Sequence, residues 1–217
     1  MTAVQELKGV VQRARKDVPT RGFSQSFELT ASFQDIDFKK QPLNMNEVVS
    51  LPNGFKNRPT VCVFATGDLA LRAKRGGADV VLGEEDLTQL ASQKRNAKKL
   101  AKNHEFFLAE AKLMVGVGKS LGTQLGPLGK MPTPLAPNAP IDDVIKNLRS
   151  SIRMRCRNQY SIACKVGDES MDDEKISENA HAILDSLEKK LPSGSRNVKN
   201  VHLKLTMGHL ASLRGAK

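Results

Sequence analysis

Strands with one apolar and one polar face are expected near both ends of this chain, and this pattern constrains the fold more than any other feature. In the segment FSQSFELTASF (23–33), apolar side chains fall on one parity, while serine, glutamate and threonine fall on the other. That alternation predicts a long, half-buried strand. The same rhythm returns in NVKNVHLKLTM (197–207), close to the other end of the chain.

The strands expected in the middle of the chain are of a different kind. Three short runs, 61–65 (VCVFA), 80–82 (VVL) and 106–109 (FFLA), are continuously apolar, and a helix-compatible segment follows each of them. Strands of this kind that alternate with helices are typical of a parallel sheet covered by helices. A loop rich in proline and glycine, GTQLGPLGKMPTPLAPNAP, is expected at 122–140, followed by a helix that begins at Ile141.

Two helices, a hairpin and a further strand complete the expected elements. Apolar residues at helical spacing predict amphipathic helices over 4–14 and within 168–190, and the acids at the start of the second helix favour its macrodipole. The segment IRMRCRNQYSIACKVG (152–167) predicts a hairpin that turns near residues 158–159, and EVVSL (47–51) predicts a strand.

This order of elements predicts an α/β fold with two domains. Residues 1–66 and 156–217 carry the half-buried strands and are expected to form one α+β domain from both ends of the chain. Residues 67–155 are expected to form a second domain inserted into the first. Two chain crossings, near 65–67 and 155–160, would then join the domains as a hinge.

Charge indicates the class of partner. The chain has 34 Lys and Arg against 23 Asp and Glu, a net charge of +11 in 217 residues, which suits a polyanion because each neutralised phosphate releases counterions. The last 29 residues (189–217) contain seven basic side chains and no acid. The run KRNAKKLAK (94–102) fits a solvated helix face and a phosphate contact about equally well. With nine aromatic residues, any base stacking must depend on very few rings.

Several classes of protein are not supported by the sequence. No apolar run approaches the roughly 20 residues that cross a bilayer, and the first residues lack the apolar region of a secretory signal. Three cysteines without a C-x-x-C pair favour reduced thiols in a cytosolic compartment. The four histidines form no metal-binding motif, and no catalytic motif is present. We therefore expect no metal, no cofactor and no catalytic residue.

One string resembles a phosphate-binding loop and fails the test. The string GVGKS (116–120) contains the Gly-Lys-Ser of that motif, but the position where the motif requires its first glycine is Leu113. The preceding residues have a helical pattern, so the string is expected at the end of a helix.

The string LGTQLGPLGKMPTP (121–134) is the most distinctive in the chain, and it resembles the signature of the ribosomal protein L1 family. Members of that family sit in the mobile stalk beside the ribosomal exit site for tRNA. Three further stretches agree in order and spacing: GFSQSFELTASF (22–33), VGDESMDDEKISENAHAIL (166–184) and KLTMGHL (204–210). The resemblance covers nearly the whole chain and is greatest to archaeal members.

The resemblance implies a split domain formed by both termini and an inserted Rossmann-like, three-layer α/β domain. It also implies that the split domain supplies the main contact with large-subunit rRNA. Carried over by position, the RNA-binding residues here are Phe23, Ser26, Glu28, Gly167, Lys204, Thr206, Met207 and Gly208.

These residue types suit recognition of RNA. Ser26 and Glu28 lie on the polar parity and can bond ribose hydroxyls or base edges, which carry information that phosphate contacts lack. Thr206 adds a donor and an acceptor, and Gly208 would let the backbone approach RNA without a Cβ. Phe23 lies on the apolar parity, so its alternative interpretation is core at the start of the strand.

The expected function is that of a structural, non-enzymatic protein of the large ribosomal subunit in the cytoplasm. By resemblance, the stalk assists the release of deacylated tRNA from the exit site, and some members repress translation by binding their own mRNA. The free protein is expected to be a monomer without membrane contact. Two alternatives remain: a nucleotide-dependent enzyme that uses the central βαβ block, and a general basic protein without RNA specificity.

Overall fold

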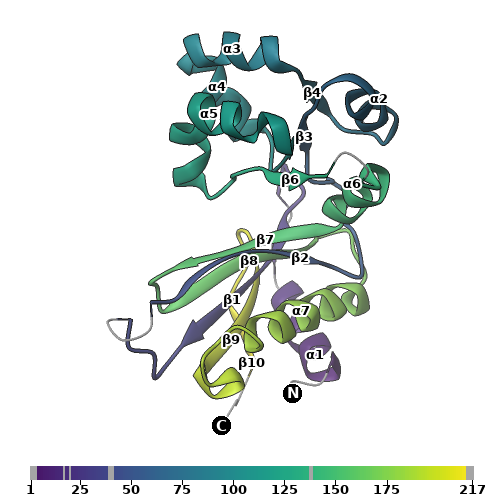
Figure 1. Ribbon diagram of the computed structural model, residues 1–217. Coiled ribbons are helices and arrows are strands. Elements are labelled where there is room, and N and C mark those ends of the chain that lie inside the picture. The colour runs from purple at the N-terminus through teal and green to yellow at the C-terminus, as the bar shows by residue number, and fades with distance from the viewer. Residues whose placement is uncertain (1–3, 17, 20, 39–41, 137–138, 214–217) are drawn as a thin grey trace. The chain divides into compact units, whose positions relative to one another are not determined.

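The computed structural model describes residues 4–16, 18–19, 21–38, 42–136 and 139–213, and it divides into two compact units. The split unit comprises residues 1–56 and 151–217, and the inserted unit comprises residues 57–150 (Figure 1). Antiparallel strands build the sheets of the split unit, and parallel strands build the sheet of the inserted unit. The predicted α/β fold class is therefore confirmed.

A four-stranded antiparallel sheet with strand order β10–β9–β1–β8 forms the centre of the split unit, beside a two-stranded ribbon of β2 and β7. The elements of this unit are α1 (Val4–Arg15), β1 (Ser26–Phe33), β2 (Asn44–Ser50), β7 (Ser151–Arg157), β8 (Ser161–Asp168), α7 (Asp173–Glu188), the 3₁₀ turn η2 (Gly194–Asn197), β9 (Val198–Leu205) and β10 (Ala211–Leu213).

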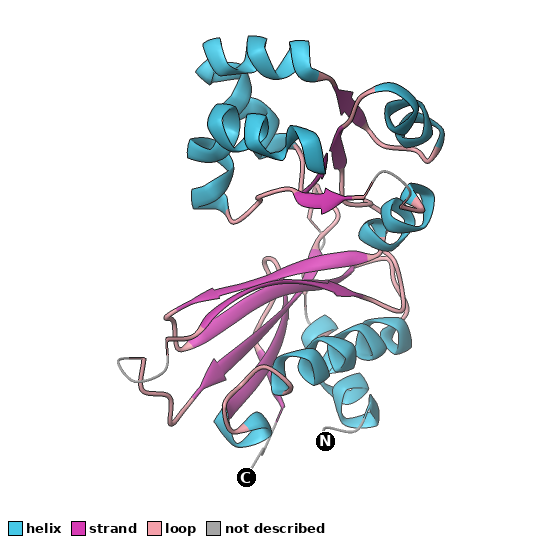
Figure 2. Ribbon diagram, viewed as in Figure 1, coloured by secondary structure: helices cyan, strands magenta, loops and turns pink. Residues whose placement is uncertain are grey.

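Helices α1 and α7 pack against each other and cover one face of this sheet (Figure 2). The alternation along β1 decides which side chains meet them, since Phe27, Leu29 and Ala31 are completely buried and the residues between them are half-exposed. The predicted apolar stripes of both helices are confirmed, except that Val4 at the first turn of α1 is 39% exposed. The polar side chains of β1 point to the opposite face of the sheet, which we call the open face.

Two expectations for the split unit are wrong. Strand β1 begins at Ser26, so Phe23 lies outside the strand and is exposed. The segments β7 and β8 do form strands on either side of the turn at Asn158, but they do not pair as a hairpin: β7 pairs with β2 and β8 pairs with β1. Each segment instead pairs along nearly its whole length with a strand from the first quarter of the chain, which satisfies its backbone hydrogen bonds.

The inserted unit is a parallel sheet of strand order β4–β3–β5–β6 between two layers of helices. Alternate residues of its central strands face opposite cores, one formed with α3, α4 and α5 and the other with α2 and α6. Its elements are β3 (Val61–Phe64), α2 (Gly67–Arg75), β4 (Val80–Leu82), α3 (Glu84–Ser92), α4 (Lys94–Asn103), β5 (Phe106–Glu110), η1 (Ala111–Leu113), α5 (Met114–Leu128), β6 (Thr133–Leu135) and α6 (Ile141–Arg149).

The chain passes from one unit to the other between residues 56 and 57 and again between residues 150 and 151. The boundaries predicted from the sequence were 66/67 and 155/156. Strand β3, which was expected in the split domain, pairs in parallel with β4 and β5 and therefore belongs to the inserted unit. Strand β7 pairs over its whole length with β2, and therefore belongs entirely to the split unit. The expected crossings near 65–67 and 155–160 are displaced for the same reason.

The long loop predicted at 122–140 is wrong in its first half. Helix α5 continues to Leu128, since Leu121 and Leu125 extend its buried face at helical spacing. Pro127 lies in the last turn, and the helix ends at Gly129, whose φ of 68° is left-handed. The string GVGKS is consequently inside the helix and not at its end. No helix within the described ranges is long and apolar enough to cross a membrane.

Candidate nucleic-acid interface

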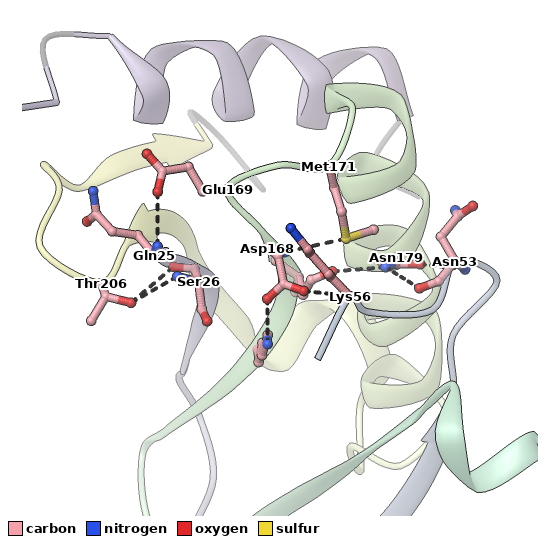
Figure 3. A network of polar contacts seen from close by, with 11 residues as sticks. Gln25, Ser26, Asn53, Lys56, Asp168, Glu169, Met171, Asn179 and Thr206 are labelled. Carbon is pink, nitrogen blue, oxygen red and sulfur yellow. Dashed lines mark hydrogen bonds and ion pairs between the residues drawn. The ribbon is translucent and has the colours of Figure 1, made fainter. Parts of the chain in front are cut away.

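Thr206 joins the two ends of the chain where the inner strands β1 and β9 of the four-stranded sheet begin and end. Its backbone N–H donates to the carbonyl oxygen of Ser26 at 3.0 Å. The Ser26 N–H donates to Thr206 Oγ1 at 3.2 Å, and that hydroxyl donates to the Ser26 carbonyl at 3.2 Å (Figure 3). Residues 180 positions apart in sequence therefore form one surface. Because its proton is engaged here, the Thr206 hydroxyl is not the free donor that the sequence suggested.

Gln25 is a second connection that the sequence analysis missed. Its side chain is completely buried, and its Oε1 accepts a hydrogen bond from the Met207 N–H at 3.0 Å. The Gln25 N–H donates to Glu169 Oε2 at 2.9 Å (Figure 3). A polar residue on the apolar parity of FSQSFELTASF was the available signal. Through its Oε1 and its backbone N–H, Gln25 fixes the chain entering β1 against the chain leaving β9 and against Glu169, while its Nε2 is buried without a hydrogen-bond partner among the described residues.

Glu28 lies between lysines of both neighbouring strands. Strand register places it opposite Lys204 on β9 and Lys165 on β8. The Lys204 Nζ is 3.9 Å from Glu28 Oε2. Lys165 was not predicted; its ammonium is 2.6 Å from Asp168 Oδ1 and 4.8 Å from the centre of the Phe55 ring. The open face therefore presents one carboxylate flanked by two half-exposed cations.

Two large apolar side chains are exposed near these polar groups in the chain. Phe23 is 52% exposed and Met207 is 57% exposed. The alternative interpretation of Phe23 as core is therefore wrong. Both side chains offer an apolar surface on which a sugar or base can lie.

Gly208 serves the protein's own packing. Its N–H donates to the Leu205 carbonyl at 2.9 Å, which closes a tight turn. A Cβ at Gly208 would lie 3.0 Å from Leu205 Cβ and 3.3 Å from Val18 Cγ2. Internal packing therefore accounts for this glycine, because the chain itself fills the space that a Cβ needs; its expected contact with RNA stays a prediction.

Gly167 is buried under α7. A Cβ there would lie 2.9 Å from Ile176 Cγ1, closer than side-chain carbons approach in proteins. The register between β1 and β8 shifts at this point, which turns neighbouring residues of β8 inward. The expectation that Gly167 contacts RNA is therefore not retained, since the residue is enclosed by the helix that packs on it.

Helix α1 pairs with the acidic segment 168–174. The Arg15 guanidinium contacts Asp173 Oδ1 at 2.6 Å, donates to the carbonyls of Glu169 and Met171, and lies 4.9 Å from the centre of the Phe27 ring.

Two further contacts engage acids of the same segment. The Lys8 ammonium lies 2.5 Å from Glu174 Oε1, and this hydrogen bond lowers the pKa of Glu174. Asp168 is buried and accepts a hydrogen bond from the Lys56 N–H at 2.9 Å (Figure 3). All five acids of the segment are engaged by the protein itself, Asp172 by Lys175 and Glu169 by the Gln25 N–H, so their capacity to repel a nearby polyanion is reduced.

The inserted unit carries a buried carboxylate at the point where a doubly wound fold would hold a phosphate. The ends of β3 and β5 meet at the start of α2, where strand order reverses. There the buried carboxylate of Glu110 accepts hydrogen bonds from the Thr66 N–H at 3.2 Å and the Thr66 hydroxyl at 3.0 Å. A carboxylate of the chain thus lies against the N-cap residue of α2, and its negative charge disfavours a nucleotide phosphate beside it.

Comparison with known proteins agrees with this architecture. Residues 13–209 match the model of the Ribosomal protein L1p/L10e family. The protein named large ribosomal subunit protein uL1 from Cenarchaeum symbiosum is 44% identical over 97% of this chain and 96% of its own length. Those from Archaeoglobus fulgidus and Thermofilum pendens are 42% and 40% identical over 91% and 96% of this chain, and over 92% of their own lengths. Members of the family are structural components of ribosomes, not enzymes, and the chain belongs to the Ribosomal protein L1p/L10e family.

Proposed function

We propose that this chain is a structural protein of the large ribosomal subunit that binds folded rRNA through the open sheet face of the split unit. The observation that carries the proposal is the junction of Ser26 and Thr206, because it joins the first strand to the turn after the last one. Ser26, Glu28, Lys204 and Met207 thereby come from distant parts of the sequence to one side of the unit.

The chemistry of this face suits a shaped RNA. The Glu28 carboxylate would repel a phosphate backbone, but it can accept from a ribose 2′-hydroxyl or an exocyclic amine. Lys204 and Lys165 beside it supply attraction to the backbone without sequence information. Phe23 and Met207 offer apolar contact with an unstacked base or sugar. Of the residues expected to bind RNA, we retain Phe23, Ser26, Glu28, Lys204 and Met207, with Thr206 as a positioning residue.

The wider role follows from the uL1 relatives and the family resemblance. We propose that the chain acts on cytoplasmic ribosomes, that it is monomeric when free, and that its stalk assists the release of deacylated tRNA from the exit site. The two compact units would be the two domains, and the crossings at 56/57 and 150/151 would form the hinge. Binding to the protein's own mRNA would use the same sheet face, if that mRNA reproduces the rRNA shape.

The two alternatives make different demands. A nucleotide-dependent enzyme needs a site for a phosphate at the start of α2, and the Glu110 carboxylate bound to Thr66 would repel that phosphate. A general basic protein would bind any RNA according to charge alone, so removing an acid should improve its affinity.

The test uses Glu28→Gln, with Glu6→Gln as a matched control that makes the same change of charge at an exposed position of α1. Loss of a hydrogen bond to a charged group predicts that Glu28→Gln weakens binding to a folded large-subunit rRNA fragment by about tenfold. Binding to a scrambled RNA of equal length should be unchanged or slightly tighter. Tighter binding of the rRNA fragment by Glu28→Gln would refute the proposal and favour a purely electrostatic interaction.

A further inference from the structure

Helix α4 of the inserted unit presents a dense row of cations. The buried side chains of Ala97 and Ala101 hold one side of the helix against the core, and the helix contains no acid. Within the described part of the chain, none of its cations forms an ion pair with an acidic side chain. The exposed cations are Lys94, Arg95, Lys98, Lys99 and Lys102.

The position of these charges opposes the stability of the helix. Lys94 and Arg95 stand in the first turn, where the positive end of the helix macrodipole disfavours a cation by roughly 0.3–1 kcal/mol each. If the helix face met only water, cations in its first turn would lower the stability of the helix without any compensating interaction. The arrangement is explained if an anionic partner neutralises it.

A pocket of about 300 Å³ lies beside this row, between α3 and α4. Leu90 and Leu100 give it an apolar wall. The side-chain amides of Gln89, Gln93 and Asn96 line it as well, beside the Asp86 carboxylate, which accepts a hydrogen bond from the Gly83 N–H. Asn96 Nδ2 donates one of its two hydrogens to Gln93 Oε1, so its second hydrogen and its Oδ1 are the groups that a base would meet. Asparagine and glutamine amides carry a donor and an acceptor together, which matches the edge of a nucleobase.

Lys130, a residue of the distinctive string 121–134, forms hydrogen bonds with the end of α4. Its ammonium donates to the carbonyl of Ala101 at 3.0 Å and to that of His104 at 2.7 Å, both at the end of α4. The Gly129 turn that ends α5 positions Lys130 for this contact. The signature segment therefore holds α4, and with it the pocket, in a fixed place.

We propose that α3 and α4 form a second RNA-binding surface, separate from the sheet face of the split unit, that takes a single-stranded RNA loop. Lys94, Lys98 and Lys102 follow one another at about 6 Å of helix rise and would contact successive phosphates. One unstacked nucleotide would enter the pocket and meet the amides of Gln89 and Asn96. Cations alone would fit an acidic peptide equally well; the amide-lined pocket favours RNA.

The first test measures the salt dependence of binding by the full-length chain to a fluorescent hairpin RNA with a single-stranded loop. The row variant is Lys94→Gln, Lys98→Gln and Lys102→Gln. Loss of three contacts with single-stranded phosphates should reduce the slope of log K against log salt by about 2. The control variant, Lys74→Gln with Arg75→Gln and Lys146→Gln, removes the same charge from exposed positions of α2 and α6 and should leave that slope nearly unchanged.

The second test separates the pocket from the charges. The pocket variant, Gln89→Ala with Asn96→Ala, keeps good helix formers in both helices and removes the two amides. We expect the unaltered chain to prefer the hairpin over a fully paired duplex of equal length, and the pocket variant to lose about tenfold of that preference at an unchanged salt slope. Circular dichroism checks that both helices are retained.

Three outcomes would overturn this inference: an unchanged salt slope in the row variant, equal binding of hairpin and duplex by the unaltered chain, or tighter binding of a polyglutamate peptide than of the hairpin. The last outcome would identify an acidic protein partner instead. None of these results bears on the sheet face, whose test is discrimination between rRNA and scrambled RNA by the Glu28 variant.

Discussion

Replacing Gly167 by alanine tests whether this glycine supports the fold, as its surroundings indicate, or contacts RNA. The added Cβ would lie 2.9 Å from Cγ1 of Ile176, a completely buried residue of α7. Its other near contacts, Met171 Sδ at 3.5 Å and Ile176 Cδ1 at 3.6 Å, are ordinary van der Waals distances. The conflict is therefore with one atom, and removing that atom should remove it.

Two opposing effects set the magnitude. Alanine restricts the unfolded chain more than glycine does, which stabilises a protein by about 0.4–1 kcal/mol where the backbone allows it. Overpacking a filled core costs about 1–3 kcal/mol. We therefore expect Gly167→Ala to lower the free energy of unfolding of the split unit by about 1–2 kcal/mol. In an Ile176→Ala background the overlap is absent, and the same change should become stabilising by about 0.5 kcal/mol.

The assay is urea unfolding followed by tyrosine fluorescence. The chain has no tryptophan and one tyrosine, Tyr160, which precedes β8 in the split unit, so the signal reports that unit alone. The four chains of a double-mutant cycle give the coupling energy between positions 167 and 176. Equal destabilisation by Gly167→Ala in both backgrounds would refute the packing argument. So would a loss of RNA affinity by the folded variant without any change in stability.

Three further predictions concern stability and reactivity. Gly208→Val should destabilise the split unit by about 1–3 kcal/mol in the same urea assay, because its Cβ would crowd Leu205. Lys8→Gln should lower the melting temperature near neutral pH. This difference should shrink as pH falls below 4.5, because Glu174 has a depressed pKa in the folded state and its pairing is lost when it is protonated. Burial raises the pKa of the Cys164 thiol to about 12, so alkylation at pH 8 should be slow until urea unfolds the chain.

Each of these has a contrary result. Unchanged stability of Gly208→Val would mean that the turn after β9 relaxes freely. A difference for Lys8→Gln that persists undiminished in acid would show that Lys8 acts through contacts other than Glu174. Native alkylation of Cys164 as fast as that of the unfolded chain would show that its buried position in β8 opens easily.

Residue types and hydrophobic periods were enough to predict much of the fold. Burial of apolar side chains imposes its period directly on the sequence. The period therefore predicted the half-buried strands β1 and β9, the fully buried strands β3 and β5, and the amphipathic helices α1 and α7. The end of α5 was missed because its proline and glycines, read locally, favour a loop. The buried spacing of Leu121 and Leu125 prevails over that preference in the folded unit.

The sequence by itself determined the polar face of β1, the excess of cations and the family resemblance, because these depend on which residues are present and on their short-range spacing. Only the tertiary structure decided that Gln25 and Thr206 connect the two ends of the chain, that Lys165 flanks Glu28, and that Gly167 and Gly208 are glycines for internal packing. The strand contacts join residues more than a hundred positions apart, and the packing of the two glycines depends on how α7 and the turn after β9 fold back onto the sheet. Local patterns carry no information about those distances, and the cooperative packing of the whole unit fixes them.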